Sequence, residues 1–287
     1  MASAESRQDP APGRPAPSVS VIVITFNEER NIERCLGSLR WAGEIIVVDS
    51  FSSDPTVDLA RKYTSRIIQH AYDGDIRQRE RGFGAATGDW LMYVDADEEV
   101  SPGLAAEILS AVASGNPIDG YFVPRKVFAL GRWIEHGGWS PDHSFRLFRR
   151  GSYLPHYAEV HGGFSVSGAT GQLSAPLYHY TYDSISQYLS KMNDYTSLQV
   201  SARIGERMSP AGRLAKLVFS PVSHFIRKYV SNRGYKDGMP GFLLAALGSV
   251  YTLALYAKLW EYDYRGREGA GQLPPVTNVE LQKLRRA

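Results

Sequence analysis

The stretch Trp90-Leu91-Met92-Tyr93-Val94-Asp95-Ala96-Asp97-Glu98-Glu99 decides how the chain folds. Its apolar half suits a strand buried in a sheet, whereas Asp95 and Asp97 need compensation for their charge. Side chains alternate along an extended chain, so we expect Asp95 and Asp97 to point to the same side. Two like charges repel there, and Mg²⁺ or Mn²⁺ would remove the repulsion. A polar turn followed by a helix cap is the alternative for an Asp-Ala-Asp triplet taken alone.

Length and composition are those of an ordinary globular protein. The 287 residues, 43% of them hydrophobic, suffice for a large core and one or two domains. The net charge of +2 gives no reason to expect nucleic acid as a partner. The single cysteine, Cys35, excludes an intrachain disulfide and is expected in the core. Residues 1–18 have no apolar run, which predicts a disordered leader and a catalytic part in the cytosol.

Short β-branched stretches alternate with helical patterns in the first half of the chain. Strands are expected at residues 19–25, 44–49, 66–68 and 90–94. Helix starts are expected at Asn27, at Asp54-Pro55 and at Ser101-Pro102, which are N-cap residues and caps followed by proline. This alternation predicts an α/β fold, with a doubly wound and mostly parallel sheet.

Polar residues follow three of these expected strands. Thr25 with Asn27, Asp49, and Asp95 with Asp97 all stand at carboxyl ends. Ligands of parallel α/β sheets bind beyond these ends, so we expect one site there. The convergence of three polar strand ends favours a ligand site over turn chemistry.

The pattern changes after residue 120. Residues 121–179 read as short strands with glycine turns, which predicts an antiparallel extension of the sheet. Residues 128–141 are rich in Gly, Trp and His, and we expect an active-site loop there.

The last third of the chain is predicted to be helical. Ser184 and Gln187 form a capping box that opens a helix to about residue 206, and residues 212–230 form a basic amphipathic pattern. Residues 239–257 include no charged residue, and the length of this stretch is close to the ~20 residues needed to span a bilayer. We expect membrane contact, with a spanning, re-entrant or surface-lying helix all open and a buried core helix as the alternative. The predicted parts are a leader (1–18), a catalytic domain (19–182), a membrane-associating helical region (183–265) and a polar tail (266–287).

Several motifs carry a resemblance to a known family. Residues 21–28, 45–50 and 95–98 resemble the opening domain of family-2 glycosyltransferases, which have the GT-A fold. Residues 88–90, 137–142, 146–148, 160–161, 177–180 and 258–261 are similar to the subgroup that decorates the lipopolysaccharide core. The chain departs from this subgroup at two positions. Glu80 stands where the subgroup usually has Asn, and Gly162 stands where the subgroup tends to have Glu.

The resemblance implies an inverting glycosyltransferase. The donor would be a nucleotide-sugar, with UDP favoured, and the acceptor a lipid-linked saccharide or lipopolysaccharide core. The enzyme would work at the cytoplasmic face of the inner membrane of a bacterium. A bound cation would neutralise the leaving diphosphate, and a carboxylate base would activate the acceptor hydroxyl.

Site residues follow from the resemblance and the strand ends. Asp97 is expected as the direct metal ligand, Asp95 as a ligand of the ribose or the metal, and His161 or His179 as a further metal ligand. The residues expected to hold the nucleobase and ribose are Thr25, Asn27, Glu28, Asp49, Ser50 and Arg79.

The acceptor side is expected in the later segments. Asp142 is the first candidate for the base and Glu159 the second. A turn or N-cap role is the alternative for Asp142. Arg146 would steady the diphosphate or be one of the solvated arginines of its strand, and Trp139 would stack on a sugar face or simply pack in the core.

Two other functions fit the same sequence. A polyprenyl-phosphate sugar synthase would transfer the sugar to a lipid phosphate, which needs no strong base. A non-catalytic nucleotide-sugar binding module tethered to the membrane is the alternative outside the enzymes, and the intact Asp95 and Asp97 argue against it.

Overall fold

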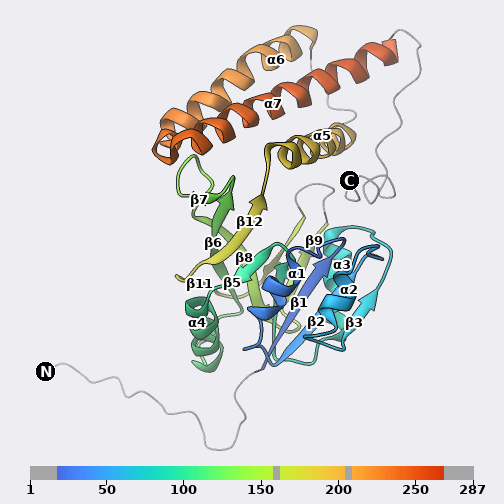
Figure 1. The fold of residues 1–287 in the computed structure, drawn as a ribbon, viewed down its shortest axis with the longest axis vertical. Helices are drawn as coiled ribbons and strands as arrows, with labels where there is room; N and C mark the ends of the chain where they lie inside the picture. The colour runs from blue at the N-terminus through green and yellow to red at the C-terminus, as the bar shows by residue number, and fades with distance from the viewer. Residues whose placement is uncertain (1–17, 158–161, 204–208, 268–287) are drawn as a thin grey trace, which may run out of the picture.

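The computed structural model describes residues 18–157, 162–203 and 209–267, and its strands form one large sheet and one small one (Figure 1). The large sheet has the order β3-β2-β1-β4-β8-β6-β12-β5, and β7 and β11 also pair with β6. The strands are β1 Val19–Thr25, β2 Glu44–Asp49, β3 Ile67–Gln69, β4 Trp90–Asp95, β5 Glu98–Val100, β6 Gly120–Ala129, β7 Arg132–Ile134, β8 Asp142–Arg149, β9 Tyr153–His156, β10 Gly163–Val166, β11 Thr170–Gln172 and β12 Leu177–Tyr182.

Helices cover both faces of the large sheet and form a separate layer beyond its end. They are α1 Ile32–Gly37, α2 Thr56–Ala60, α3 Asp75–Ala85, α4 Pro102–Ala113, α5 Ile185–Ala202, α6 Pro210–Phe225 and α7 Gly238–Arg267, with a π-helix η1 at Ile226–Ser231 and a 3₁₀-helix η2 at Gly234–Asp237.

The first half of the sheet is parallel, as predicted. β3, β2, β1 and β4 run in the same direction, and every residue of β1 except Ile24 is buried. On one face Val21 and Val23 pack in a cluster with α1 and α4, which includes the buried Cys35. On the other face Ile22 packs against residues of α3. The apolar side chains of β1 therefore enter two apolar layers, one on each face of the sheet, which defines the doubly wound α/β fold.

The second half of the sheet mixes directions. β8 is antiparallel to both β4 and β6, whereas β12 runs parallel to β6 and antiparallel to β5. The antiparallel extension is therefore centred on β8. The β5–β12 pairing places His179 opposite Glu98.

Two local expectations were wrong. Asn27 does not cap a helix, because α1 begins at Ile32 and Asn27 takes a left-handed conformation with φ of 52°. Asparagine tolerates this conformation better than most residues, and its Oδ1 accepts a hydrogen bond from the Ser53 backbone N–H at 2.8 Å. The chain also does not stay extended through Asp97: β4 ends at Asp95, and Ala96 and Asp97 form a turn before β5.

Two caps were predicted correctly. Ser101 accepts a hydrogen bond from the Leu104 backbone N–H at the start of α4, with Pro102 at the first helical position. Ser184 accepts one from the Gln187 backbone N–H at the start of α5. Both caps rest on local chemistry, which a sequence motif records directly.

Three helices form the layer beyond β7 and β12, with α6 and α7 side by side (Figure 1). α7 also packs along α5. The helical stretch Gly234–Arg265 is long and apolar enough to cross a membrane, judged by length and composition. It covers the uncharged stretch 239–257.

Candidate active site

The loops after β1 and β2 are tied together by side-chain hydrogen bonds. Asp49 is fully buried, and Oδ2 of its carboxylate accepts from the Ser52 backbone N–H at 3.0 Å and from Nε2 of Gln69 at 3.1 Å. The Asn27 backbone N–H donates to Oγ of Ser52 at 2.9 Å. Asp49 and Asn27 therefore shape the rim at the strand ends, and any contact with a nucleoside would come from a surface they hold in place.

Glu28 extends this rim toward the acidic turn after β4. Its carboxylate accepts from Nδ2 of Asn31 at 2.7 Å, and its backbone N–H donates to Oγ1 of Thr56. Burial, and next the negative charge of Asp97, raise the pKa of Glu28 to about 7. Glu28 and Asp97 thus share one electrostatic environment, although they follow different strands.

α3 supplies the next two groups. Nε2 of Gln78 donates to Oγ of Ser50 at 3.2 Å, and both residues are buried. Nη2 of Arg79 lies 2.6 Å from Oδ1 of Asp95. Thr25 is also buried, and its hydroxyl has no hydrogen-bond partner within the described residues. Gln78 was not predicted as a site residue from the sequence, although its place directly before Arg79 was a signal.

Asp95 lies at the centre of a charged cluster. Nη2 of Arg146 lies 3.3 Å from Oδ2 of Asp95 and 2.7 Å from Oε1 of Glu98, and Glu98 also accepts from the Asp95 backbone N–H at 2.9 Å. Burial alone would raise the pKa of Asp95, but the charges of Arg79 and Arg146 hold it well below its usual range. Asp95 is therefore ionised and held by two arginines.

Arg146 is placed differently from the sequence expectation. It is 2% exposed and its guanidinium lies beneath Asp95 and Glu98, so it contacts these carboxylates. Glu98, fully buried, was missed as a member of the site although it belongs to the stretch from which the fold was predicted. A carboxylate so close to the apolar residues of β4 was the signal in the sequence that Glu98 needs a positively charged partner.

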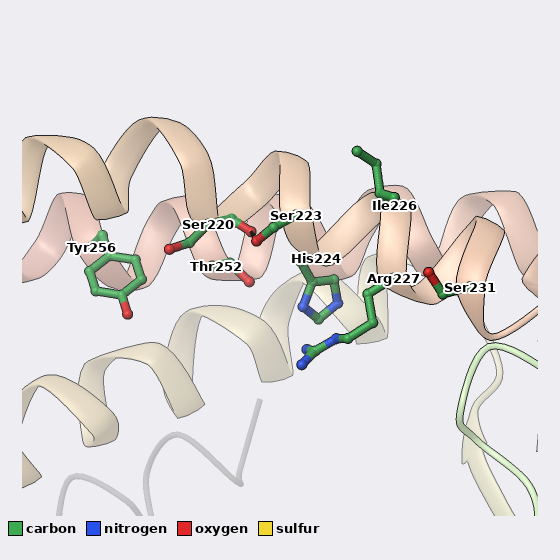
Figure 2. Close-up of a pocket in the computed structure, with 8 residues that line it drawn as sticks. All are labelled: Ser220, Ser223, His224, Ile226, Arg227, Ser231, Thr252 and Tyr256. Carbon is green, nitrogen blue, oxygen red and sulfur yellow. Dashed lines mark hydrogen bonds between the residues drawn. The ribbon is translucent and has the colours of Figure 1, made fainter.

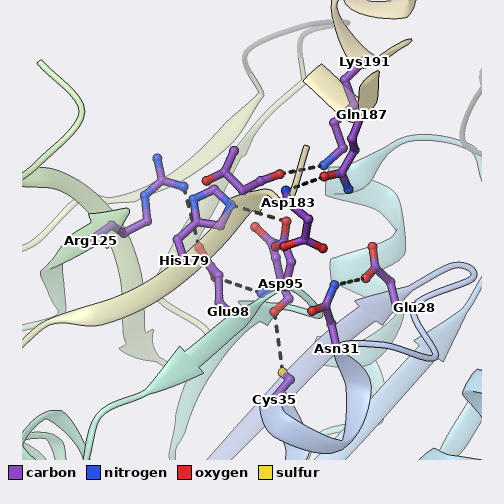
Figure 3. Close-up of polar contacts among 12 residues, drawn as sticks. Glu28, Asn31, Cys35, Asp95, Glu98, Arg125, His179, Asp183, Gln187 and Lys191 are labelled. Carbon is purple, nitrogen blue, oxygen red and sulfur yellow. Dashed lines mark hydrogen bonds and ion pairs between the residues drawn. The ribbon is translucent and has the colours of Figure 1, made fainter. Parts of the chain in front are cut away.

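Asp97 and His179 form a second pair beside the arginine cluster. Oδ2 of Asp97 lies 3.4 Å from Nε2 of His179, and both side chains are slightly less than one-fifth exposed. Burial lowers the pKa of His179, but the hydrogen bond and charge of Asp97 reverse this and leave the pKa raised. Figure 3 shows Glu28 and Asn31 on one side of Asp95 and His179 and Arg125 on the other.

The candidate metal ligands do not form a closed site. Within residues 18–157, 162–203 and 209–267, no three His, Cys, Asp or Glu side chains are arranged to hold a metal. Asp97 and His179 supply one oxygen and one nitrogen donor, a set that suits Mn²⁺. His161 and Glu159 lie outside the described residues.

The candidate base Asp142 is joined to the cluster through Arg125. Asp142 begins β8, its side chain is half exposed, and it forms an ion pair with Nη2 of Arg125. Nη1 of the same arginine lies 3.6 Å from Oε1 of Glu98. Arg125 was not singled out from the sequence, because only the β6–β8 pairing brings it opposite Asp142.

Trp139 lies in the loop that leads to Asp142. Its ring packs against the ring of Tyr182 at 6.4 Å between centroids, and Nζ of Lys228 lies 5.8 Å from its centroid. The loop is thereby joined to the helical layer.

An α/β sheet with paired carboxylates at the carboxyl end of β4 is the arrangement expected of a nucleotide-sugar transferase. The sequence model of glycosyl transferase family 2 matches residues 20–167, and the chain therefore belongs to this family. The GT-A fold and the enzyme class predicted from the motifs are thereby confirmed: the chain is a family-2 glycosyltransferase.

Relatives over most of the chain are also glycosyltransferases. Lipopolysaccharide core biosynthesis glycosyltransferase LpsC of Rhizobium meliloti (strain 1021) is 28% identical over 85% of this chain and 92% of the relative. An uncharacterized glycosyltransferase of Rickettsia bellii (strain RML369-C) is 25% identical over 85% of this chain and 86% of the relative. Among solved structures, the mannosyltransferase PcManGT of Pyrobaculum calidifontis, in complex with GDP-Man and Mn²⁺, is 14% identical. The match covers 85% of this chain and 87% of the mannosyltransferase chain, with a TM-score of 0.47.

Proposed function

We propose that this glycosyltransferase is inverting and metal-dependent. It transfers a sugar from a nucleotide-sugar, with UDP favoured, to a lipid-linked saccharide or lipopolysaccharide core at the cytoplasmic face of the inner membrane of a bacterium. The observation that carries this proposal is the Asp97–His179 pair beside the arginine-held Asp95, at the carboxyl end of β4.

The metal site of this proposal centres on Asp97. Mg²⁺ and Mn²⁺ in transferases take one or two protein ligands and complete their shell with substrate phosphates and water. Asp97 and His179 fit such an open set, with His161 as a further candidate, whereas two arginines hold the carboxylate of Asp95. When bound, the cation neutralises charge that develops on the leaving diphosphate.

The donor pocket of the proposal lies over the joined loops after β1 and β2. Asn27 and Asp49 hold these loops through Ser52, and Ser50 is held by Gln78. The nucleobase and ribose would rest on this preformed rim, with Glu28 between the rim and the metal pair. A preformed rim lowers the entropic cost of donor binding.

The base of the proposal is Asp142, with Glu159 as the second candidate. The Asp142 carboxylate is half exposed and Arg125 fixes its orientation, so it can accept the proton of an acceptor hydroxyl from the side opposite the diphosphate. Trp139 lies three residues before Asp142 in the chain, and we propose that its ring stacks on a sugar face of the acceptor.

A lipid-linked acceptor is proposed because of the helical layer. Five apolar residues at intervals of four form a stripe on α6 and η1, each at least 50% exposed; we call this the α6 stripe: Leu214, Val218, Val222, Ile226 and Val230. Residues four apart share one face of a helix. An apolar face flanked by the basic residues of the same segment is typical of helices that lie in a membrane interface.

The contacts of α7 favour a helix that lies along the membrane. α5 packs along α7, and Nζ of Lys258 in α7 donates to Oγ1 of Thr196 and to Oγ of Ser197 in α5, each at 2.8 Å. α5 also carries Lys191 and Asp194, charges that a bilayer core excludes. A spanning α7 would draw these charges into the hydrocarbon, so we favour the surface-lying arrangement.

Donor hydrolysis tests the proposed chemistry. The full chain in mild detergent is offered UDP-, GDP- and dTDP-sugars with Mn²⁺ or Mg²⁺, and nucleotide release is recorded. We expect slow release from one donor, which is lost in Asp97→Ala and in EDTA but kept in Asp58→Ala, whose carboxylate is exposed on α2. Release that persists in EDTA would contradict the metal assignment. The absence of release and of cation-dependent donor binding would instead favour a binding module.

A further inference from the structure

A groove lies between α6, η1 and α7, outside the candidate active site. Its volume is about 610 Å³, and of its eight lining residues only Ile226 is apolar. The rest comprise His224, Arg227 and five hydroxyl side chains, with no carboxylate among them. The groove thus offers hydrogen-bond donors and positive charge without a competing acid.

Several of these donors are not bonded to other groups of the protein within the described residues. Within the described part of the chain, the hydroxyls of Ser220, Ser231 and Tyr256 have no hydrogen-bond partner, and the Arg227 guanidinium forms no ion pair. Ser223 donates to the Ser220 carbonyl oxygen at 3.0 Å and so remains available only as an acceptor in this rotamer. An arginine and several free hydroxyl groups are the donors that bind phosphate oxygens in proteins.

The backbone of α7 makes room for the imidazole of this groove. A Cβ atom at Gly248 would lie 2.5 Å from Nε2 of His224, so any larger residue would displace the ring. Burial, and then the charges of Lys228 and Arg227, lower the pKa of His224, which keeps the ring neutral with one N–H to donate. Figure 2 shows His224 and Arg227 extending from one side of the α6–η1 segment, whereas Ile226 points the other way.

We propose that this groove binds a phosphate group carried by a lipid. Ile226, a member of the α6 stripe, is half exposed and points away from His224 and Arg227 (Figure 2). If the stripe enters the boundary between headgroups and acyl chains, the polar side of the same helix, about 10 Å away, lies among the headgroups with His224 and Arg227. This inference rests on the membrane contact that the proposed function includes, but not on the proposed sugar-transfer reaction.

The groove is also connected to the loop that carries the candidate base. Nζ of Lys228, the residue after Arg227, donates to the Gly138 carbonyl oxygen at 3.4 Å. The adjacent Trp139 ring faces the same ammonium group. A lipid phosphate held by Arg227 would therefore anchor an acceptor beside the loop that leads to Asp142.

Calorimetric titration with short-chain soluble lipids tests the proposal. The full chain in detergent is titrated with dihexanoyl phosphatidic acid, dihexanoyl phosphatidylglycerol and, as the phosphate-free control, dihexanoylglycerol. We expect the phosphate lipids to bind and dihexanoylglycerol not to bind. Arg227→Ala should weaken binding by about tenfold or more, because it removes a charge-assisted hydrogen bond. Lys236→Ala, an exposed cation on η2 outside the groove, should bind like the unmodified chain.

The two phosphate lipids separate the sources of the ligand. Preference for the phosphate monoester would indicate the terminal phosphate of a lipid-linked acceptor, and equal affinity would indicate a bulk phospholipid headgroup. Equal affinities of Arg227→Ala and the unmodified chain, or binding of dihexanoylglycerol as tight as that of phosphatidic acid, would overturn the proposal. Donor hydrolysis by the same preparation reports on the proposed catalytic function independently.

Discussion

Nη2 of Arg79 lies 2.6 Å from Oδ1 of Asp95, so α3 delivers a positive charge to the carboxylate that ends β4. Arg146 reaches the other oxygen of the same carboxylate from β8. The charge of Asp95 is thus compensated by two arginines, whereas Asp97 pairs with His179. The two acids of the Asp-Ala-Asp turn therefore have different surroundings, although one residue separates them.

Substitution of Arg146 by methionine should strongly destabilise the fold. Arg146→Met removes a buried cation and leaves the fully buried Glu98 with the more distant Arg125 alone as an ion-pair partner, and breaking a buried pair costs about 3–5 kcal/mol. Urea unfolding of the full chain measures the loss. Arg61→Met, which removes an exposed partner of Asp58, should cost about 1 kcal/mol or less. Similar losses in the two variants would show that the buried cluster does not stabilise the fold.

The general fold was predictable because its signals are local. β-Branched runs such as residues 19–25 and the caps at Ser101 and Ser184 depend on neighbouring residues only. The partners of Asp95 were not predictable in the same way, because Arg79 and Arg146 are 16 and 51 residues away. Sheet pairing that the sequence does not record brings them together.

The candidate site shows the same limit. Asp49 and Asn27 were correctly placed at strand ends, but their side chains bond to protein loops, which polar character alone does not reveal. The burial of Glu98 could not be predicted from the alternation of β4, because a turn at Ala96 and Asp97 separates β4 from β5, where Glu98 lies. Arg125 acquires its place beside Asp142 only through the register of β6 and β8.

Glu28→Gln should change how stability depends on pH. The pKa of Glu28 is raised from 4.5 to about 7, so between these values the folded state holds a proton that the unfolded state has lost. The ionised form is disfavoured in the fold, and stability therefore falls as pH rises from about 4.5 to 7. The glutamine variant avoids this loss, and relative to the unmodified chain it should gain up to about 3 kcal/mol between pH about 4 and 8.

Unfolding by urea at several pH values, in EDTA, measures this gain. Glu29→Gln removes the next carboxylate along the chain, which is exposed, and controls for the change in net charge. A stability difference between Glu28→Gln and the unmodified chain that stays constant across this pH range would show that Glu28 does not titrate abnormally.

Asp142→Asn should slow sugar transfer by about 10²–10⁴-fold, the usual contribution of a general base. The donor KM should stay unchanged, because the proposed donor rim lies on the loops after β1 and β2. Transfer to a saccharide acceptor under saturating donor measures the effect, with Asp58→Asn as the control. A loss in Glu159→Gln but not in Asp142→Asn would transfer the role of base to Glu159. Full activity in both variants would favour a phosphate acceptor, as in a polyprenyl-phosphate sugar synthase.

The double variant Val218→Asp/Val222→Asp should abolish binding to membranes. Both residues belong to the α6 stripe and are more than 50% exposed, so they can be charged without opening the core. Each exposed valine that enters lipid contributes about 1.5 kcal/mol or more of transfer free energy, and a carboxylate in its place opposes insertion. Sedimentation with vesicles containing phosphatidylglycerol measures the bound fraction. Leu109→Asp, on the exposed face of α4, controls for a charge placed on an apolar surface position. If the double variant sediments as fully as the control, the α6 stripe does not carry the membrane contact, and another surface of the chain binds the vesicles.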